Sequence, residues 1–294
     1  NFIRRGRPEY VLILSGDHIY QMDYEVLLQY HREKNAEATI CVIRVPMDEA
    51  SRYGIVDVDE DFRVRDFLEK PQNPPSNLAN MGVYIFNYAA LERLLSEDRD
   101  MANSNHDFGK DILPRMVREN MEIFAFSYGG YWIDVGTVEA YWEAHMDLLK
   151  SPPSFQLNDR SWIIHTQSEE RPPIHVHNGA TVRNSMLTHG TVVYPGAVVE
   201  NSVISPGVVI GPNAVVRESV ILTDAYIDTG AVVERCIVDK VAVIGEGAHV
   251  GEISEVGDLA ITCVGKGAHV PPGFHIGRGS ILGTDLREGD FAAF

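Results

Sequence analysis

The second half of the sequence carries an aliphatic residue at every fifth or sixth position, and no other feature limits the fold as strongly. Two positions before most of these residues stands a small one. A three-sided coil explains both features, because each side points one aliphatic side chain into a narrow interior and needs a small neighbour where the backbone turns. The aliphatic positions are Val193, Val199, Ile204, Ile210, Val216, Leu222, Ile227, Val233, Val238, Ile244, Val250, Val264, Val270, Ile276 and Leu282.

Glycine and proline support the same interpretation. Pairs such as Pro195-Gly196 and Pro206-Gly207 are typical of tight turns, which the corners of such coils require. An ordinary β-sandwich is the alternative, but its turns would recur at intervals of about 8 to 12 residues. The region from Ile174 onward therefore predicts a left-handed parallel β-helix of hexapeptide repeats.

The first half alternates short β-rich runs with helical patterns, which indicates an α/β unit built on a parallel sheet. The apolar run from Tyr10 to Ser15 is expected to form a strand covered on both faces. Pro152-Pro153 marks a boundary, because neither a helix nor an inner strand continues through two prolines. We therefore predict domains over residues 1–150 and 151–294. Further strands are expected at 38–45, 53–58, 64–69, 81–86, 123–127 and 131–134, and helices at 24–34, 88–95, 110–118 and 137–149.

The composition limits the class of partner. With 294 residues and 45% hydrophobic content, the chain has enough apolar surface for two cores. Its 42 acidic residues against 25 basic ones give a net charge of −17, which repels polyanions, so nucleic acid is not expected as a partner. A small phosphate compound would bind only where a few basic residues gather in one cleft.

The cysteines and the lack of long apolar stretches favour a cytoplasmic location. Cys41, Cys236 and Cys263 have no metal-binding spacing and leave an odd number for disulfides. No stretch approaches the roughly 20 apolar residues of a transmembrane helix, so no membrane partner is expected. The chain begins at Asn1 rather than Met, and its first strand looks like the middle of a sheet, so a preceding segment is expected to be missing.

Two aspartates are candidates for a metal site. Asp17 follows the first strand in the run Leu-Ser-Gly-Asp-His-Ile-Tyr at 14–20, at the carboxyl end where ligands bind in open α/β sheets. Asp134 stands between a strand and a helix start in Tyr-Trp-Ile-Asp-Val-Gly-Thr at 131–137. Together they could hold one Mg²⁺ through oxygen. Each also has a structural alternative, since Asp17 could cap a turn and Asp134 the helix.

Two lysines are candidates for binding a sugar phosphate. Glu69 and Lys70 end a strand before Pro71, where the lysine can meet phosphate as a point charge while the glutamate accepts hydrogen bonds from sugar hydroxyls. An exposed, solvated pair is the alternative. Lys110, in His-Asp-Phe-Gly-Lys-Asp at 106–111, stands at a helix start, where a cation opposes the helix dipole. That local conflict favours a role for Lys110 in substrate binding.

These segments together resemble the ADP-glucose pyrophosphorylases, also called glucose-1-phosphate adenylyltransferases, over nearly all of the chain. The resemblance implies that Asp17 and Asp134 hold the catalytic Mg²⁺ and that Lys70 fixes the attacking phosphate. The motifs that carry it lie at 14–20, at 67–71 (Phe-Leu-Glu-Lys-Pro), at 80–84 (Asn-Met-Gly-Val-Tyr), at 106–111 and at 131–142. The residues that it places around glucose 1-phosphate are Gly54, Glu69, Lys70 and Asn80.

The resemblance also implies a fold, an activity and an assembly. The fold is α/β, a Rossmann-like nucleotidyltransferase domain followed by the β-helix, and members are usually tetramers, built from identical or different subunits. The implied enzyme joins ATP and glucose 1-phosphate into ADP-glucose and releases pyrophosphate.

Three departures from the family pattern limit these implications. Asn80 stands where the family usually has Ser, and Ile133 where it has Arg. The Gly-rich loop that cradles the nucleotide triphosphate is also missing. The nucleotidyltransferase domain is therefore expected to be incomplete, and the chain alone to bind ATP poorly and not to turn over.

Three other functions stay open. The first is nucleotidyl transfer to form dTDP-glucose or GDP-mannose, since the base is chosen mostly in the missing segment. The second is a non-catalytic regulatory subunit, which the residues at Asn80 and Ile133 favour. The third is a hexapeptide acyltransferase, in which a coil histidine acts as general base. The histidines within the repeats are His189, His249, His269 and His275.

Overall fold

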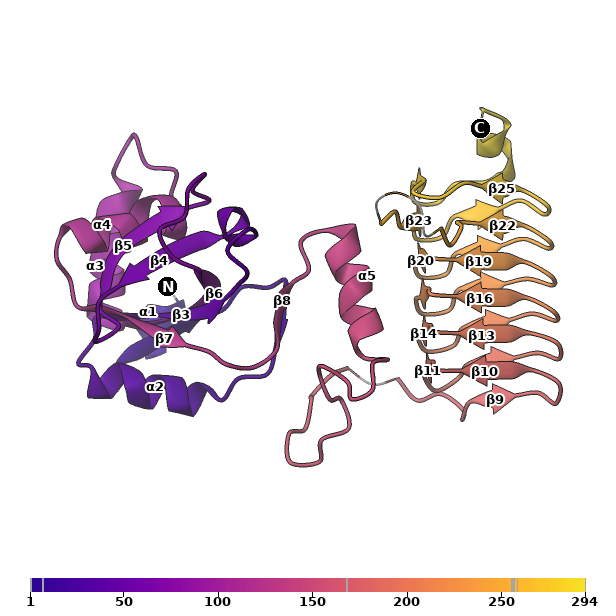
Figure 1. Ribbon diagram of the computed structural model, residues 1–294, viewed down its shortest axis with the longest axis horizontal. Coiled ribbons are helices and arrows are strands. Elements are labelled where there is room, and N and C mark those ends of the chain that lie inside the picture. The colour runs from indigo at the N-terminus through magenta and orange to yellow at the C-terminus, as the bar shows by residue number, and fades with distance from the viewer. Residues whose placement is uncertain (1, 7, 168, 255–256, 258, 294) are drawn as a thin grey trace. The chain divides into compact units, whose positions relative to one another are not determined.

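The computed structural model describes residues 2–6, 8–167, 169–254, 257 and 259–293. The chain forms two compact units, residues 1–134 and 135–294 (Figure 1). The division falls at 134 rather than at the predicted residue 150, because helix α5 (Val138–Asp147) packs within the second unit. None of the described helices is both long and apolar enough to cross a membrane.

Every strand and helix predicted for the first half is present, with ends shifted by a few residues. Helix α2 begins as expected, because the Asp23 side chain accepts a hydrogen bond from the Glu25 backbone nitrogen at 2.9 Å. The elements of this unit are α1 (Phe2–Gly6), β1 (Tyr10–Ile13), β2 (His18–Tyr20), α2 (Tyr24–Glu33), β3 (Ala38–Arg44), η1 (Ala50–Arg52), β4 (Gly54–Val58), β5 (Val64–Glu69), β6 (Leu78–Asn87), α3 (Tyr88–Arg99), the π-helical turn η2 (Phe108–Ile112), α4 (Leu113–Arg118), β7 (Ile123–Ser127) and β8 (Trp132–Asp134).

The main sheet of the first unit is mixed, so the prediction of a parallel sheet was wrong. Its strands run in the order β5-β4-β6-β3-β7, and β1 also pairs with β6. Strand β6 is antiparallel to β1, β3 and β4, whereas β3 and β7 are parallel. Strands β1 and β3, which α2 connects, do run parallel to each other, as the alternation of strand and helix predicts. However, β6 arrives later in the chain and inserts between these two strands, which local periodicity does not reveal.

Strand β1 is less covered than its continuous apolar sequence predicted. Leu12 is 39% exposed and Leu14 is 44% exposed, although a strand covered on both faces was expected. Among the described residues, β1 pairs with β6 alone, so it lies at an edge of the sheet. Edge strands bury less of their surface than inner strands.

Strand β6 divides the core of this unit between its two faces. Met81, Val83 and Ile85 pack on one side with Leu27 of α2. Phe86 and Tyr84 point to the other side, where α3, η2 and α4 contribute buried side chains. This follows from the alternation of side chains along a strand. Helices therefore cover both faces of the sheet, α2 on one and α3 with α4 on the other (Figure 1).

The second unit is the predicted left-handed β-helix, formed by three parallel six-stranded sheets. From Thr181 to Val250, paired residues of neighbouring coils are 17 positions apart, as in the pair Val199 and Val216. Its strands are β9 (His175–Val176), β10 (Thr181–Arg183), β11 (Met186–Leu187), β12 (Val192–Val193), β13 (Val198–Glu200), β14 (Val203–Ile204), β15 (Val209–Ile210), β16 (Val215–Arg217), β17 (Val220–Ile221), β18 (Tyr226–Ile227), β19 (Val232–Glu234), β20 (Cys236–Val238), β21 (Val243–Ile244), β22 (His249–Val250), β23 (Thr262–Val264), β24 (His269–Val270), β25 (His275–Ile276) and β26 (Ile281–Leu282).

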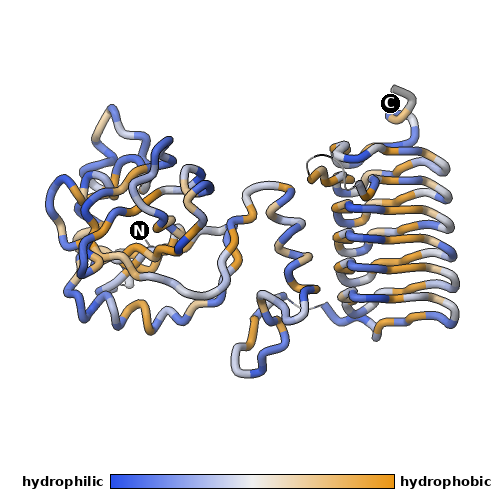
Figure 2. The backbone as a smooth tube through the Cα atoms, viewed as in Figure 1, coloured by the Kyte–Doolittle hydropathy of each residue, from blue (hydrophilic) through white to orange (hydrophobic). Residues whose placement is uncertain are grey.

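The predicted aliphatic positions fill the interior of the β-helix, with one correction. All of them are buried except Leu222, whose place is taken by the fully buried Ile221. The reason is the 17-residue register, which aligns Ile221 with Ile204 before it and Val238 after it. Figure 2 shows the resulting apolar positions at the same place in successive coils.

Two further elements close the β-helix. Helix α5 covers an outward surface, since Trp142 Nε1 donates to the Glu218 carbonyl oxygen at 2.7 Å and Val220, beside the inward-pointing Ile221, is fully buried. At the C-terminal end, the 3₁₀ helix η3 (Glu288–Ala293) places Phe291 edge-on against Phe274 at 5.1 Å. Capping segments of this kind protect the last coil of a solenoid.

The coils continue past an insertion. Cys236 pairs with Thr262, 26 residues later instead of 17, so nine extra residues lie between these two coils. Strand pairing then resumes in all three sheets.

Candidate functional site

A short two-stranded sheet brings together the two aspartates that the sequence singled out. Strand β2 pairs antiparallel with β8, and His18 lies opposite Asp134. His18 Nε2 lies 3.6 Å from Asp17 Oδ1 and 4.0 Å from Asp134 Oδ2. Both carboxylates therefore lie within 4.0 Å of one imidazole nitrogen, although they are far apart in the sequence.

Both carboxylates remain accessible to solvent and suited to a cation. Their side chains are 62% exposed at Asp17 and 37% exposed at Asp134. The Ser15 hydroxyl donates to Asp17 Oδ1 at 2.6 Å, which is the main reason that the pKa of Asp17 is lowered; partial desolvation opposes it and His18 adds to it. Asp17 is thus ionised at neutral pH.

The donor set fits a hard divalent cation that keeps other ligands. In the described part of the chain, no three His, Cys, Asp or Glu side chains form a complete metal-binding group. Two carboxylates with the remaining positions filled by water and substrate phosphate are typical of Mg²⁺ sites.

A hollow of about 380 Å³ is lined by neighbours of the two aspartates, although neither Asp17 nor Asp134 lines it. Ser15 lines the hollow, and its hydroxyl donates a hydrogen bond to Asp17. Gly82 also lines it, and a β-carbon at Gly82 would stand 3.2 Å from His18 Cε1. Its other lining residues are Ile13, Leu14, Glu69, Asn80, Tyr84, His106, Asp107, Phe108 and Gly109. A hollow of this size with a few convergent polar groups is typical of a small-molecule site, but its lining among the described residues includes no Lys or Arg, so the basic cluster expected around a phosphate does not lie in its walls.

Two glycines shape the space around the Glu69 carboxylate. Gly54 lies opposite Glu69 in the pairing of β4 with β5. A β-carbon on Gly54 would stand 3.0 Å from Glu69 Oε2, and one on Gly109 would stand 2.9 Å from the same atom. Glycine at both positions therefore leaves space for the Glu69 carboxylate. The predicted residue Gly54 thus acts on the site indirectly, through the position of Glu69.

Asn80 and Tyr84 form one wall of the hollow. Asn80 Nδ2 donates to the Tyr84 hydroxyl at 2.7 Å, and its Oδ1 accepts from the Gly82 backbone nitrogen at 3.0 Å. Burial raises the pKa of Tyr84 to about 12. The Tyr84 ring stacks on Phe108, with centroids 5.9 Å apart. Sequence reasoning missed Tyr84, but strand alternation places it on the same face of β6 as Asn80 and Gly82.

The two candidate lysines lie in different surroundings. Lys70 directly follows β5, is exposed and has a left-handed backbone with φ of 47°. Lys110 donates through its backbone nitrogen to Asp107 Oδ1 at 2.9 Å, but its side chain lines a separate hollow of about 550 Å³ with Arg115 and Arg118.

Comparison with known proteins matches each half of the chain to a family model. Residues 1–151 match the family model described as "Nucleotidyl transferase", and residues 174–260 match "GlmU-like, C-terminal hexapeptide". The chain belongs to the nucleotidyl transferase family. All the site residues described above fall within the part that matches this family.

Relatives of this chain carry a more specific name than the family. It is similar to proteins named glucose-1-phosphate adenylyltransferase from Halalkalibacterium halodurans (49% identity), Bacillus mycoides (50%) and Clostridium novyi (45%). Each match covers 193 residues, or 66% of this chain and 50%, 51% and 50% of the respective relative. The chain thus spans about half the length of the curated relatives that it matches.

A further feature of the candidate site is a buried donor with no partner among the described residues. This donor is Trp132 Nε1. The indole ring contacts the rings of His18 and Tyr53 edge-on, with centroids 5.1 and 5.7 Å away. Sequence reasoning missed Trp132 and His18, although both lie within the motifs that flank the two aspartates.

Proposed function

We propose that this chain contributes the sugar-phosphate and metal-binding part of an enzyme that joins ATP and glucose 1-phosphate into ADP-glucose. The proposal is carried by two observations: Asp17 and Asp134 lie within 4.0 Å of the same His18 nitrogen, and Ser15, which binds Asp17, lines a hollow together with Glu69 and Asn80. The names of the relatives favour glucose 1-phosphate and ATP over other sugar phosphates and nucleotides.

The reaction needs no protein nucleophile. A phosphate oxygen of glucose 1-phosphate attacks the α-phosphorus of ATP, the bond from that phosphorus to the bridging oxygen breaks, and pyrophosphate leaves with the electron pair. Mg²⁺, when bound, supplies charge that offsets the charge on the phosphate oxygens. Catalysis by the chain is then positioning of the reacting groups.

Each proposed residue has one task in this scheme. Asp17 and Asp134 would hold Mg²⁺ with their accessible carboxylates. Glu69 would accept hydrogen bonds from sugar hydroxyls within the hollow that it lines, and Lys70 would meet the phosphate as a point charge. Asn80 would shape the sugar site through its hydrogen bond to the Tyr84 hydroxyl. The neighbouring residues Gly54 and Lys110 would support this site through their backbone positions.

Isothermal titration of the chain with glucose 1-phosphate, in the presence of Mg²⁺, tests the sugar half of the proposal. We expect binding that Glu69→Gln weakens by about tenfold or more, which corresponds to about 1.4 kcal/mol. Galactose 1-phosphate and mannose 1-phosphate serve as matched ligands that should bind more weakly. Equal binding of all three, or no effect of the variant, would contradict the assignment.

Pyrophosphate release tests the nucleotide half. Because the chain alone is expected not to turn over, it is joined to a Gly-rich nucleotide-binding segment from a relative and incubated with glucose 1-phosphate and, in turn, ATP, dTTP, GTP and UTP. A preference for ATP supports ADP-glucose synthesis, whereas a preference for dTTP or GTP indicates another sugar nucleotidyltransferase. Sugar-phosphate binding without any pyrophosphate release fits the regulatory-subunit alternative.

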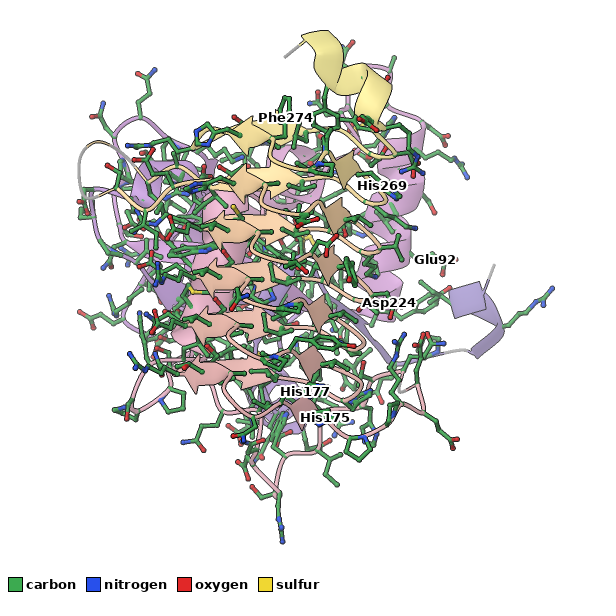
Figure 3. The ribbon with its side chains drawn as sticks, turned by 90° about the vertical axis from the view of Figure 1, so that its right-hand side faces the viewer. Glu92, His175, His177, Asp224, His269 and Phe274 are labelled. Atoms are coloured by element: carbon green, nitrogen blue, oxygen red, sulfur yellow. The ribbon has the colours of Figure 1, made fainter. Side chains whose placement is uncertain are left out.

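We also propose that the protein assembles as a homo- or hetero-tetramer in the cytoplasm, with the β-helix in the subunit contacts. The outward residues of one sheet form an apolar column of Val192, Val209, Tyr226 and Val243, one residue from each of four coils. His175 and His269 stand at the two ends of this column, on the side of the β-helix seen in Figure 3. Light scattering on the purified chain, with Tyr226→Lys as the disrupting variant, measures the assembly.

A further inference from the structure

The imidazole of His18 has a fixed orientation. Its Nδ1 lies 2.7 Å from the backbone carbonyl oxygen of Met81. A carbonyl oxygen only accepts hydrogen bonds, so Nδ1 is the donor, and in the neutral ring Nε2 carries a lone pair. The local fold of β6 therefore decides which ring nitrogen is free.

Packing holds the ring in this position. The His18 side chain is 11% exposed and meets the Trp132 ring edge-on, with an angle of 78° between the two planes. On another side lies Gly82, where a β-carbon would stand 3.2 Å from His18 Cε1 and where φ is +66°. Glycine at that position leaves room for the ring, which cannot turn away without disturbing buried neighbours.

The free nitrogen points toward the two carboxylates. At 3.6 and 4.0 Å, Nε2 is too far from Asp17 Oδ1 and Asp134 Oδ2 for direct hydrogen bonds. In the neutral ring this lone pair faces the same space as the two carboxylates, and positive charge together with a donor would satisfy all three groups there. A hydrated divalent cation brings both, because its bound waters are strong donors and Mg²⁺ keeps several of them.

We propose that His18 is a positioning residue of the cation site, whose Nε2 accepts a hydrogen bond from a water molecule carried by the cation between Asp17 and Asp134. This inference rests on the proposed metal site. Groups that hold the surroundings of a metal in this way commonly change its affinity by about 10- to 100-fold.

Binding of Mn²⁺ to the whole chain tests the inference without any assay of activity. The EPR signal of free aqueous Mn²⁺ falls as the ion binds, so titration gives a dissociation constant. His18→Phe keeps an aromatic ring against Trp132 but removes the acceptor, and we expect it to weaken binding by about tenfold or more. His18→Gln supplies a carbonyl oxygen near the position of Nε2 and should stay close to the wild-type value.

The outcomes separate this inference from the proposed function. If Asp17→Asn and Asp134→Asn leave Mn²⁺ affinity unchanged, the proposed metal site itself is wrong. If these variants abolish binding while His18→Phe binds as wild type, the role of His18 is wrong and the metal site stands. Equal weakening in His18→Phe and His18→Gln would also overturn the acceptor role.

A crystal of the wild-type chain soaked in Mn²⁺ gives a test that does not depend on the folding of any variant. Anomalous scattering locates the ion, and the density around it locates its waters. We expect a bound water within about 3 Å of His18 Nε2. An ion between the carboxylates with no water near Nε2, or with Nε2 itself as a ligand, would refute the proposal.

Discussion

Replacing Gly109 with alanine should weaken binding of glucose 1-phosphate by about tenfold while the fold stays intact. The new β-carbon would stand 2.9 Å from Glu69 Oε2, whereas ordinary contacts begin at 3.4 Å. The carboxylate must therefore retreat by about 0.5 Å, the difference between these distances. A shift of this size weakens the hydrogen bonds that the carboxylate would make to the sugar, and the loss of one such bond costs about 1.4 kcal/mol, or about tenfold in affinity.

The fold should tolerate this substitution for two reasons. Glu69 is exposed, so its carboxylate moves without disturbing the core. Gly109 also lacks the positive φ that would strain an alanine. We therefore expect the free energy of unfolding to change by less than about 1 kcal/mol.

Isothermal titration with glucose 1-phosphate measures the affinity, and urea unfolding measures stability. Gly129→Ala is the matched control, because a β-carbon there meets no atom within 4 Å. If Gly109→Ala binds the sugar phosphate as tightly as the control, then Glu69 does not position the sugar. If instead stability falls by several kcal/mol, the loss of affinity reports damage to the fold and the displacement argument fails.

Three other substitutions test packing and charge. Gly54→Ala should destabilise the first unit by about 1–3 kcal/mol in urea unfolding, since its β-carbon would stand 2.8 Å from a buried aromatic ring. Arg171 lowers the pKa of the Asp224 carboxyl through paired hydrogen bonds of 2.5 and 2.9 Å. The ion pair contributes its full stability above pH 3.8, the ordinary pKa of Asp, and loses it as pH falls through the lowered pKa of Asp224. Asp224→Asn should therefore reduce Tm at pH 7, and this reduction should shrink as pH falls below 3.8. Trp142→Phe removes the donor to Glu218 and should destabilise the second unit by about 1 kcal/mol in thermal unfolding.

The β-helix was predictable because each coil obeys the same local rule. Its interior positions follow from residue spacing, and the mistake at Leu222 shows where that rule ends. Because the spacing alternates between five and six residues, the sequence alone does not decide which of two adjacent residues points into the interior. The pairing with a neighbouring coil decides it. Pairing with Ile204 and Val238 then places Ile221 inside.

The first unit was predictable in its elements and less so in its topology. Helix caps and strand lengths are local properties, whereas the insertion of β6 between β1 and β3 depends on pairing between distant segments. The same limit applies to the site. Asp17 and Asp134 stand at the ends of recognisable strands, but the role of His18 depends on the Met81 carbonyl, 63 residues away.

The insertion between Cys236 and Thr262 shows that the stack is modular. Residues inserted at a corner between two strands do not shift the pairing of the neighbouring coils, because the register of each strand depends only on the strands next to it. Natural variants could therefore gain or lose corner peptides, or a whole turn about 4.8 Å high, without a new core having to evolve. The length of the β-helix and the peptides at its corners can therefore change in evolution without any change in the first unit.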